Sequence, residues 1–145
     1  MASWNEILDR FGHMPSQYDL VRREYLKQLS DYTGRNTILY YSAWLQKSLM
    51  NNGTFDFGIN DNDKTGFMTC IYQLDKTKGL DLILHTPGGD ISATESLVVY
   101  LKSIFGKDIR VIIPQMAMSA GTMISCCAKE VIMGKHSNLG PIDPQ

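Results

Sequence analysis

The sequence contains little cysteine and no pattern typical of a metal site. Only three of its 145 residues are cysteine, and two of them, Cys126 and Cys127, are adjacent. An odd number with an adjacent pair does not make a disulfide framework. No Cys-x-x-Cys motif occurs and the three histidines lie far apart, so no zinc site is indicated. We therefore expect buried structural thiols in a reducing compartment, the cytoplasm, and no metal.

The sequence also lacks an excess of charge of either sign, a long hydrophobic run and a nucleotide-binding loop. Fourteen basic residues stand against fifteen acidic ones, whereas proteins that bind nucleic acid usually carry a strong basic excess. No apolar run approaches the roughly 20 residues that span a bilayer, and the first 13 residues do not resemble a signal peptide. No Gly-x-x-x-x-Gly-Lys-Ser/Thr loop occurs, so any ATP-dependent step would need a separate ATPase partner. We expect neither a nucleic-acid partner nor a transmembrane segment.

The composition that remains is that of a globular protein, with 43% apolar and 20% charged residues. The length suits one domain with a substantial core. Apolar side chains recur every three or four residues from Leu20 to Leu29, which predicts an amphipathic helix that Gly34 is expected to end. We treat residues 1–36 as an N-terminal helical segment and residues 37–145 as the core.

Strands and helices alternate in the core. A capping box, Ser92-Ala93-Thr94-Glu95, is expected to open the central helix, and Thr65 is expected to cap the helix before it. Such alternation predicts an α/β fold with mainly parallel strands and right-handed crossovers. The predicted strands are 37–42, 80–86, 109–114 and 130–133; the predicted helices are 66–74, 92–105 and 119–128; residues 51–64 are predicted to be a loop.

The first of two unusual strand-to-helix turns is Thr86-Pro87-Gly88-Gly89-Asp90. Turns that leave the carboxyl ends of parallel strands share one edge of the sheet, where such folds bind their ligands. Two consecutive glycines allow the backbone to approach a ligand closely, and N–H groups just before a helix favour an anion. Taken alone, Pro-Gly-Gly is more often only a turn.

The second turn places Ser119 between small residues, with Ala117 before it and Ala120 and Gly121 after it. This arrangement resembles the serine elbow of acyl-transfer enzymes, except that Ala117 stands where the usual elbow has glycine. Taken alone, a serine before a helix is more often an N-cap. Together the two turns predict an acyl-transfer site, with Ser119 as nucleophile and the N–H groups of Gly89 and Ala120 as oxyanion donors.

Three stretches around these turns, 84–91, 117–122 and 133–145, resemble the serine dehydrogenase proteinase family. That family groups with the ClpP and signal-peptide-peptidase-A proteases on the ClpP/crotonase fold of repeated ββα and βαβ units. The resemblance implies a serine peptidase that forms an acyl-enzyme on Ser119, with Gly89 and Ala120 in the oxyanion hole and Gly88 shaping it. It also implies a peptide or protein substrate, a closed homo-oligomer, and no metal or organic cofactor.

The general base is not identified by the resemblance. ClpP proteases have a histidine where this sequence has Asp143, and His85, His136 and Lys135 are the other candidates; His85 and Asp143 are the ones expected to line the site. The strand at 130–133 would leave an exposed sheet edge, so we expect the chain to be the N-terminal part of a longer protein. Two alternatives remain open: a non-catalytic assembly or binding module with the same fold, and a crotonase-like enzyme acting on an acyl thioester.

Overall fold

A parallel sheet of four strands forms the centre of the structure. The computed structural model describes residues 15–44 and 57–142. The strands lie in the order β1-β2-β3-β5, and every neighbouring pair is parallel, so the predicted α/β fold is confirmed. The strands are β1 (Asn36–Tyr41), β2 (Leu80–His85), β3 (Ile109–Ile113) and β5 (Glu130–Met133).

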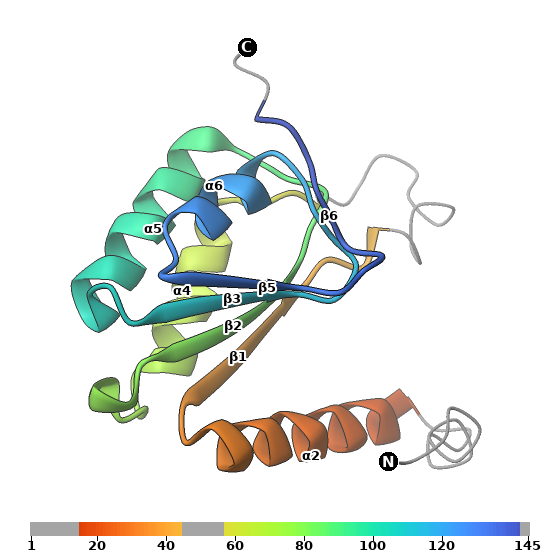
Figure 1. Cartoon of the computed structure of the whole chain (residues 1–145), viewed down its shortest axis with the longest axis vertical. Helices are drawn as coiled ribbons and strands as arrows, with labels where there is room; N and C mark the ends of the chain where they lie inside the picture. Colours follow the sequence, from red (N-terminus) through yellow and green to blue (C-terminus); the bar gives the residue numbers. More distant parts are fainter. Residues whose placement is uncertain (1–14, 45–56, 143–145) are drawn as a thin grey trace.

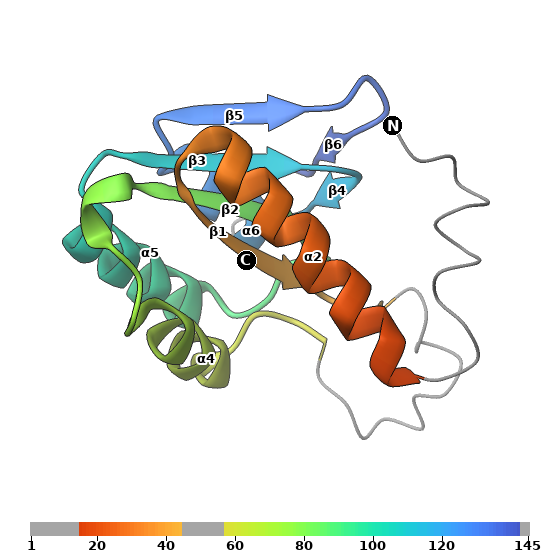
Figure 2. The same cartoon turned by 90° about the horizontal axis from the view of Figure 1, so that it is seen from below.

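Helices cover both faces of this sheet. Three of them lie together on one side, whereas α2 crosses the opposite face diagonally (Figure 1; Figure 2). A single 3₁₀ turn, Lys76–Lys78, precedes β2. Two short strands at the far end of the main sheet, β4 and β6, pair in parallel with each other. The bounds are α2 (Pro15–Thr33), α4 (Asp61–Ile71), α5 (Ile91–Phe105), α6 (Ala120–Cys126), β4 (Met116–Ala117) and β6 (Asn138–Leu139).

The side chains of β2 show how the sheet divides its two faces. Leu80, Leu82 and Leu84 have no exposed surface and point toward α4, α5 and α6. Side chains alternate along a strand, so Asp81 and His85 point to the face that α2 crosses. Each fully buried leucine contributes roughly 1.5–3 kcal/mol to folding. Their partners in the core include Ile59, Phe67, Ile71, Leu97, Leu101, Phe105, Ile109, Val111, Ile113 and Ile124.

An ion-pair network centred on the buried Asp81 of β2 joins it to Arg35, just before β1, and to Arg110 of β3. Asp81 has no exposed surface, and its carboxylate accepts hydrogen bonds from Arg35 Nε (2.6 Å), Arg110 Nη2 (2.6 Å) and Arg110 Nε (2.8 Å). Arg35 also donates to Asp108 Oδ1 at 2.9 Å. Burial raises the pKa of Asp81, but the hydrogen bonds from Arg110 and Arg35 outweigh that effect and hold it below its usual range. Asp81 therefore stays ionised and fixes both arginines.

Two helix starts differ from the sequence prediction because other side chains provide the caps. Helix α5 begins after Asp90, whose Oδ1 accepts the Ala93 N–H at 2.6 Å, so the predicted capping box at 92–95 lies inside the helix. Helix α4 begins at Asp61, because Asn60 and Asp63 form a capping box there. Thr65 is therefore a residue of α4 and not its cap.

Other expectations are confirmed only in part. Gly34 ends α2 with a φ of 67°, as predicted, and its N–H donates to Ser30 O at 2.8 Å. Cys70 and Cys126 are exposed, so the prediction of buried cysteines is wrong for both: Cys70 borders an open cavity beside β1, and Cys126 is the last residue of α6. Burial raises the pKa of the Cys127 thiol. The predicted loop at 51–64 lies partly outside the described residues, and the division of the chain at residue 36 stays a prediction.

Strand β5 forms one edge of the sheet, and all four of its residues are exposed. This agrees with the exposed edge expected from the sequence. None of the helices in the described part of the chain is both long and apolar enough to cross a membrane.

Candidate active site

The turn after β2 is fixed by a hydrogen bond within it and by two backbone hydrogen bonds to Ile59. The Gly88 N–H donates to Thr86 Oγ1 at 3.1 Å, which closes the turn. Ile59, which is 1% exposed, pairs with the next residue: its N–H donates to Gly88 O, and its carbonyl accepts from the Asp90 N–H, both at 2.8 Å. These bonds leave the N–H of Gly89 outside the hydrogen-bonded pattern.

Ser119 occupies a strained position between β4 and α6. It is the N-cap residue of α6, with φ 47° and ψ −107°, and it is the only described residue other than glycine with a positive φ. Such strain is typical of positions where the surrounding structure fixes a functional side chain. The Ser119 hydroxyl makes no capping hydrogen bond, so the alternative interpretation of Ser119 as an ordinary N-cap is not supported.

The two turns meet at this serine. A Cβ atom added to Gly88, whose φ is 120°, would lie 3.1 Å from Ser119 Cβ and 3.2 Å from Met118 O. Only glycine therefore allows the Gly88 backbone to pack so closely against the serine. The sequence placed both turns at one edge of the sheet, and the structure brings Gly88 and Ser119 into direct contact.

Two backbone N–H groups near Ser119 remain without a partner. Neither the Gly89 N–H nor the Ala120 N–H donates a hydrogen bond within residues 15–44 and 57–142. Ala120 is the first residue of α6, where helical N–H groups have no partner in their own helix. Gly89 is exposed, so a ligand can reach it.

The small sheet formed by β4 and β6 fixes the serine turn against the end of β2. Thr86 N–H donates to Met116 O at 3.2 Å, and Met118 N–H donates to Thr86 O at 3.1 Å. On the other side, Thr122 Oγ1 donates to Gly140 O at 2.7 Å. The sequence analysis missed these supports, as it missed Ile59, because two-residue strands and isolated bridges leave no periodic pattern.

None of the candidate bases that the structure describes is hydrogen-bonded to Ser119. The His85 ring is 3% exposed and stacks on Tyr41 with ring centroids 4.7 Å apart. Leu84, its neighbour in β2, faces Gly121 of α6, so the His85 ring points to the opposite face of the sheet. His136 and Lys135 are exposed, and Asp143 lies outside the described residues. The site-lining roles predicted for His85 and Asp143 stay predictions.

No group of three or more metal-ligating side chains occurs in the part of the chain that the structure describes. The candidate site therefore consists of the Ser119 hydroxyl and the two unused N–H groups of Gly89 and Ala120. This set of groups suits nucleophilic attack on a carbonyl with stabilisation of the resulting oxyanion.

Two curated proteins are similar to this chain in sequence. The chain is 34% identical over 129 residues to an uncharacterised protein of Methanocaldococcus jannaschii; the match covers 89% of this chain and 44% of that protein. A second uncharacterised protein of the same organism is 48% identical over 66 residues, which are 46% of this chain and 22% of that protein. The chain thus spans less than half the length of these curated relatives.

A family model described as ClpP-like SDH-type serine proteinase matches residues 12–145. The mixed α/β structure with its mainly parallel sheet is consistent with a ClpP-like fold. The match includes both turns of the candidate site and nearly the whole sequence, and the chain belongs to the family of ClpP-like SDH-type serine proteinases.

Proposed function

We propose that this chain carries the nucleophile and the oxyanion-binding groups of a serine peptidase. The observation that carries the proposal is the strained Ser119, whose hydroxyl is uncommitted and which contacts the Gly88-Gly89 turn. Ser119 is the proposed nucleophile, and the N–H groups of Gly89 and Ala120 are the proposed oxyanion donors. Gly88 is proposed to shape the hole without donating, because its own N–H is bonded to Thr86 Oγ1.

In this proposal Ser119 Oγ attacks the carbonyl carbon of a peptide bond and loses its proton to a base. The carbonyl oxygen becomes an oxyanion that accepts hydrogen bonds from the two N–H groups. Collapse of this intermediate releases the amine and leaves an acyl-enzyme, which water then hydrolyses. Because the donors belong to backbone held by Ile59 and by α6, they are oriented before the substrate binds.

The proposal assigns no general base. Within the described residues, no imidazole, carboxylate or ammonium group is hydrogen-bonded to Ser119 Oγ. The same observation favours a second candidate function, a non-catalytic assembly module that has kept the fold. The two candidates differ in one respect that can be measured, namely whether the Ser119 hydroxyl is reactive.

The proposed substrate is a peptide or protein, and the proposed assembly is a cytoplasmic homo-oligomer that encloses the active sites. Membership of the family supports the peptide substrate. Sedimentation analysis of the purified chain tests the assembly: a single species with the mass of a closed oligomer is expected, and a monomer at all concentrations would contradict it.

Reaction with a fluorophosphonate probe tests the proposed function. The longest form in which the chain is expressed is incubated with the probe, and the modified residue is located by mass spectrometry. A single phosphonyl adduct on Ser119 is expected, because attack by its oxygen displaces fluoride. An unmodified protein would favour the assembly module, and an adduct confined to Ser125 or Ser137 would refute the assignment of the nucleophile.

Changing Gly89 to alanine is expected to slow this labelling by about 10²–10³-fold, the usual cost of losing one oxyanion donor. The new Cβ would overlap the backbone of Ile59, lying 2.6 Å from its Cα, at a φ of 158° that only glycine adopts easily. The backbone must therefore shift and turn its N–H away from the site. Labelling rates are compared with Gly66→Ala, since a Cβ at Gly66 meets nothing within 4 Å. An unchanged rate in Gly89→Ala would exclude Gly89 as a donor.

A further inference from the structure

A groove runs along the free edge of β1, between α2 and α4. Two adjoining cavities form it and share Ile38, Leu39 and Cys70 in their walls. The cavity on the α4 side has a volume of about 270 Å³ and the one on the α2 side about 800 Å³. Neither cavity includes a residue of the candidate active site.

The floor of the groove is strand backbone with unused hydrogen-bonding groups. Within the described residues, β1 pairs only with β2, so its other edge has no partner strand. Ser42 N–H donates to His85 O, and backbone groups alternate sides along a strand. The N–H and C=O groups of Thr37, Leu39 and Tyr41 therefore point into the groove, where the structure shows no acceptor or donor for them.

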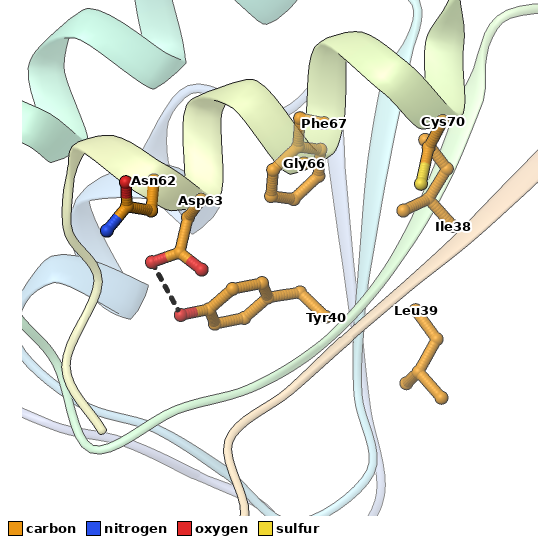
Figure 3. A pocket seen from close by; sticks show the side chains of 8 residues that line it. All are labelled: Ile38, Leu39, Tyr40, Asn62, Asp63, Gly66, Phe67 and Cys70. Atoms are coloured by element: carbon orange, nitrogen blue, oxygen red, sulfur yellow. Dashed lines mark hydrogen bonds between the residues drawn. The ribbon is translucent and has the colours of Figure 1, made fainter. Parts of the chain in front are cut away.

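The α4 side of the groove is mostly apolar (Figure 3). Tyr40 stacks on Phe67 with ring centroids 5.9 Å apart, and its hydroxyl donates to Asp63 Oδ2 at 3.2 Å. Asp63 also accepts the Asn60 N–H, so its carboxylate is already engaged. Gly66 leaves space here, since a Cβ atom added at this position would meet nothing within 4 Å. This side therefore suits an apolar side chain and disfavours an acidic one.

The α2 side of the groove carries more positive than negative charge. Arg22 is paired with Asp19 at 2.6 Å, but Arg23 has no carboxylate partner among the described residues. The Thr37 hydroxyl is buried beside them and has no hydrogen-bond partner. This side therefore suits an acidic side chain that bonds to Arg23.

We propose that the groove binds an extended segment of another protein, which adds a strand to the free edge of β1. Residues of a strand alternate between the two sides, so the segment that fits alternates apolar side chains toward α4 with acidic side chains toward α2. Backbone hydrogen bonds to Thr37, Leu39 and Tyr41 supply affinity, and the two unlike walls supply specificity. The segment docks away from Ser119 and independently of its reactivity.

A single extended chain fits this groove better than a strand embedded in a second copy of the protein. The edge of β1 is recessed between α2 and α4, and a strand in a second copy would bring that copy's own helices into the space these two occupy. The exposed edge strand β5 of a second copy is nevertheless the occupant that the experiment must exclude.

The probe is a fluorescein-labelled octapeptide with alternating valine and aspartate, and its binding is measured by fluorescence anisotropy. Binding is expected for this peptide but not for the same peptide with lysine in place of aspartate. Arg23→Glu is expected to weaken binding about tenfold. Lys27→Glu, on the same helix but outside the groove, is expected to change affinity less than twofold.

Two further variants test the floor and the apolar wall. Leu39→Pro removes one N–H donor from the free edge while the bonds of β1 to β2 stay, so binding is expected to be lost. Gly66→Leu fills the apolar cavity and is expected to weaken binding about tenfold, whereas Gly66→Ala leaves most of it open and serves as the control. Amide exchange in β2 and β3 verifies that each variant is folded.

Several results would overturn the proposal. One is the absence of binding, and another is binding that Arg23→Glu, Leu39→Pro and Gly66→Leu all leave unchanged. A third is self-association that occupies the groove and that Ile132→Lys, on the edge of β5, abolishes. A fourth is binding that disappears in a longer form of the chain, because a further segment of the same chain would then occupy the groove. Loss of fluorophosphonate labelling in Ser119 variants affects none of these measurements.

Discussion

Replacing Ser119 with alanine is expected to abolish covalent labelling and to lower any peptide hydrolysis by at least about 10⁴-fold, with the fold unchanged. The hydroxyl makes no hydrogen bond as a cap, so its removal costs no capping interaction. Alanine adopts the φ of 47° no more easily than serine does, so the backbone strain is nearly the same in both proteins. The substitution is therefore expected to remove the reactive hydroxyl and to leave the stability nearly unchanged.

Ser125→Ala provides the matched control for this experiment. Ser125 lies in the same helix, is 1% exposed, and donates to Gly121 O at 2.7 Å. Its loss is expected to cost about 1 kcal/mol of stability and to leave labelling within twofold. Labelling that survives Ser119→Ala, or that Ser125→Ala removes, would show that Ser119 is not the nucleophile.

Replacing Asp81 with alanine is expected to lower the free energy of unfolding by about 3 kcal/mol. Removing one partner of a buried ion pair usually costs 3–5 kcal/mol, because the other charge is left buried and unpaired. Here the side chains of Arg35 and Arg110 keep 16% and 25% of their surface in solvent, so the lower end of that range applies. Urea unfolding followed by circular dichroism measures the difference.

Asp108→Ala is the control for this experiment. It also removes a carboxylate that pairs with Arg35, but one that is partly exposed. The Asp108 side chain is 46% exposed and makes one ion pair, so its removal is expected to cost less than about 1 kcal/mol. The free energies of unfolding of the two variants are expected to differ by more than the error of the extrapolation to zero urea. Equal losses would mean that the buried network contributes no more than a surface pair.

The stability supplied by Asp81 is also expected to depend on pH. Its pKa is lower in the folded protein than in the unfolded chain, so the unfolded state takes up a proton first as pH falls. The contribution is complete above the unfolded pKa of about 4 and disappears as pH falls through the folded value. Asp81→Ala should accordingly flatten the acid limb of a stability profile, and an unchanged slope would contradict this linkage.

The features that were predictable from the sequence are those with a period or a local signal. Alternating apolar strands and helices predicted the parallel sheet, and the small residues around Ser119 and Gly89 indicated the two turns that meet in the structure. The sequence could also have predicted the face on which His85 lies, because Leu80, Leu82 and Leu84 share one face of β2 and His85 must point to the other.

The features that escaped prediction depend on contacts between residues far apart in sequence. Asp81 interrupts an apolar strand, and only its bonds to Arg35 and Arg110, 46 and 29 residues away, explain its burial. Ile59 sits in a segment that resembles a polar loop, yet it fixes Gly88 and Asp90 through two backbone bonds. Neither contact leaves a local pattern in the sequence. One fixes a turn of the candidate site, and the other pairs a buried carboxylate.

The order of strands in the sheet bears on how the chain folds during synthesis. The order β1-β2-β3-β5 is also their order along the chain, so no strand has to insert between two that have already paired. When each of these strands leaves the ribosome, its neighbour on the N-terminal side of the sheet has already been synthesised. The growing sheet thus exposes one new edge strand at each step. Within the described residues, the last of these edge strands is β5.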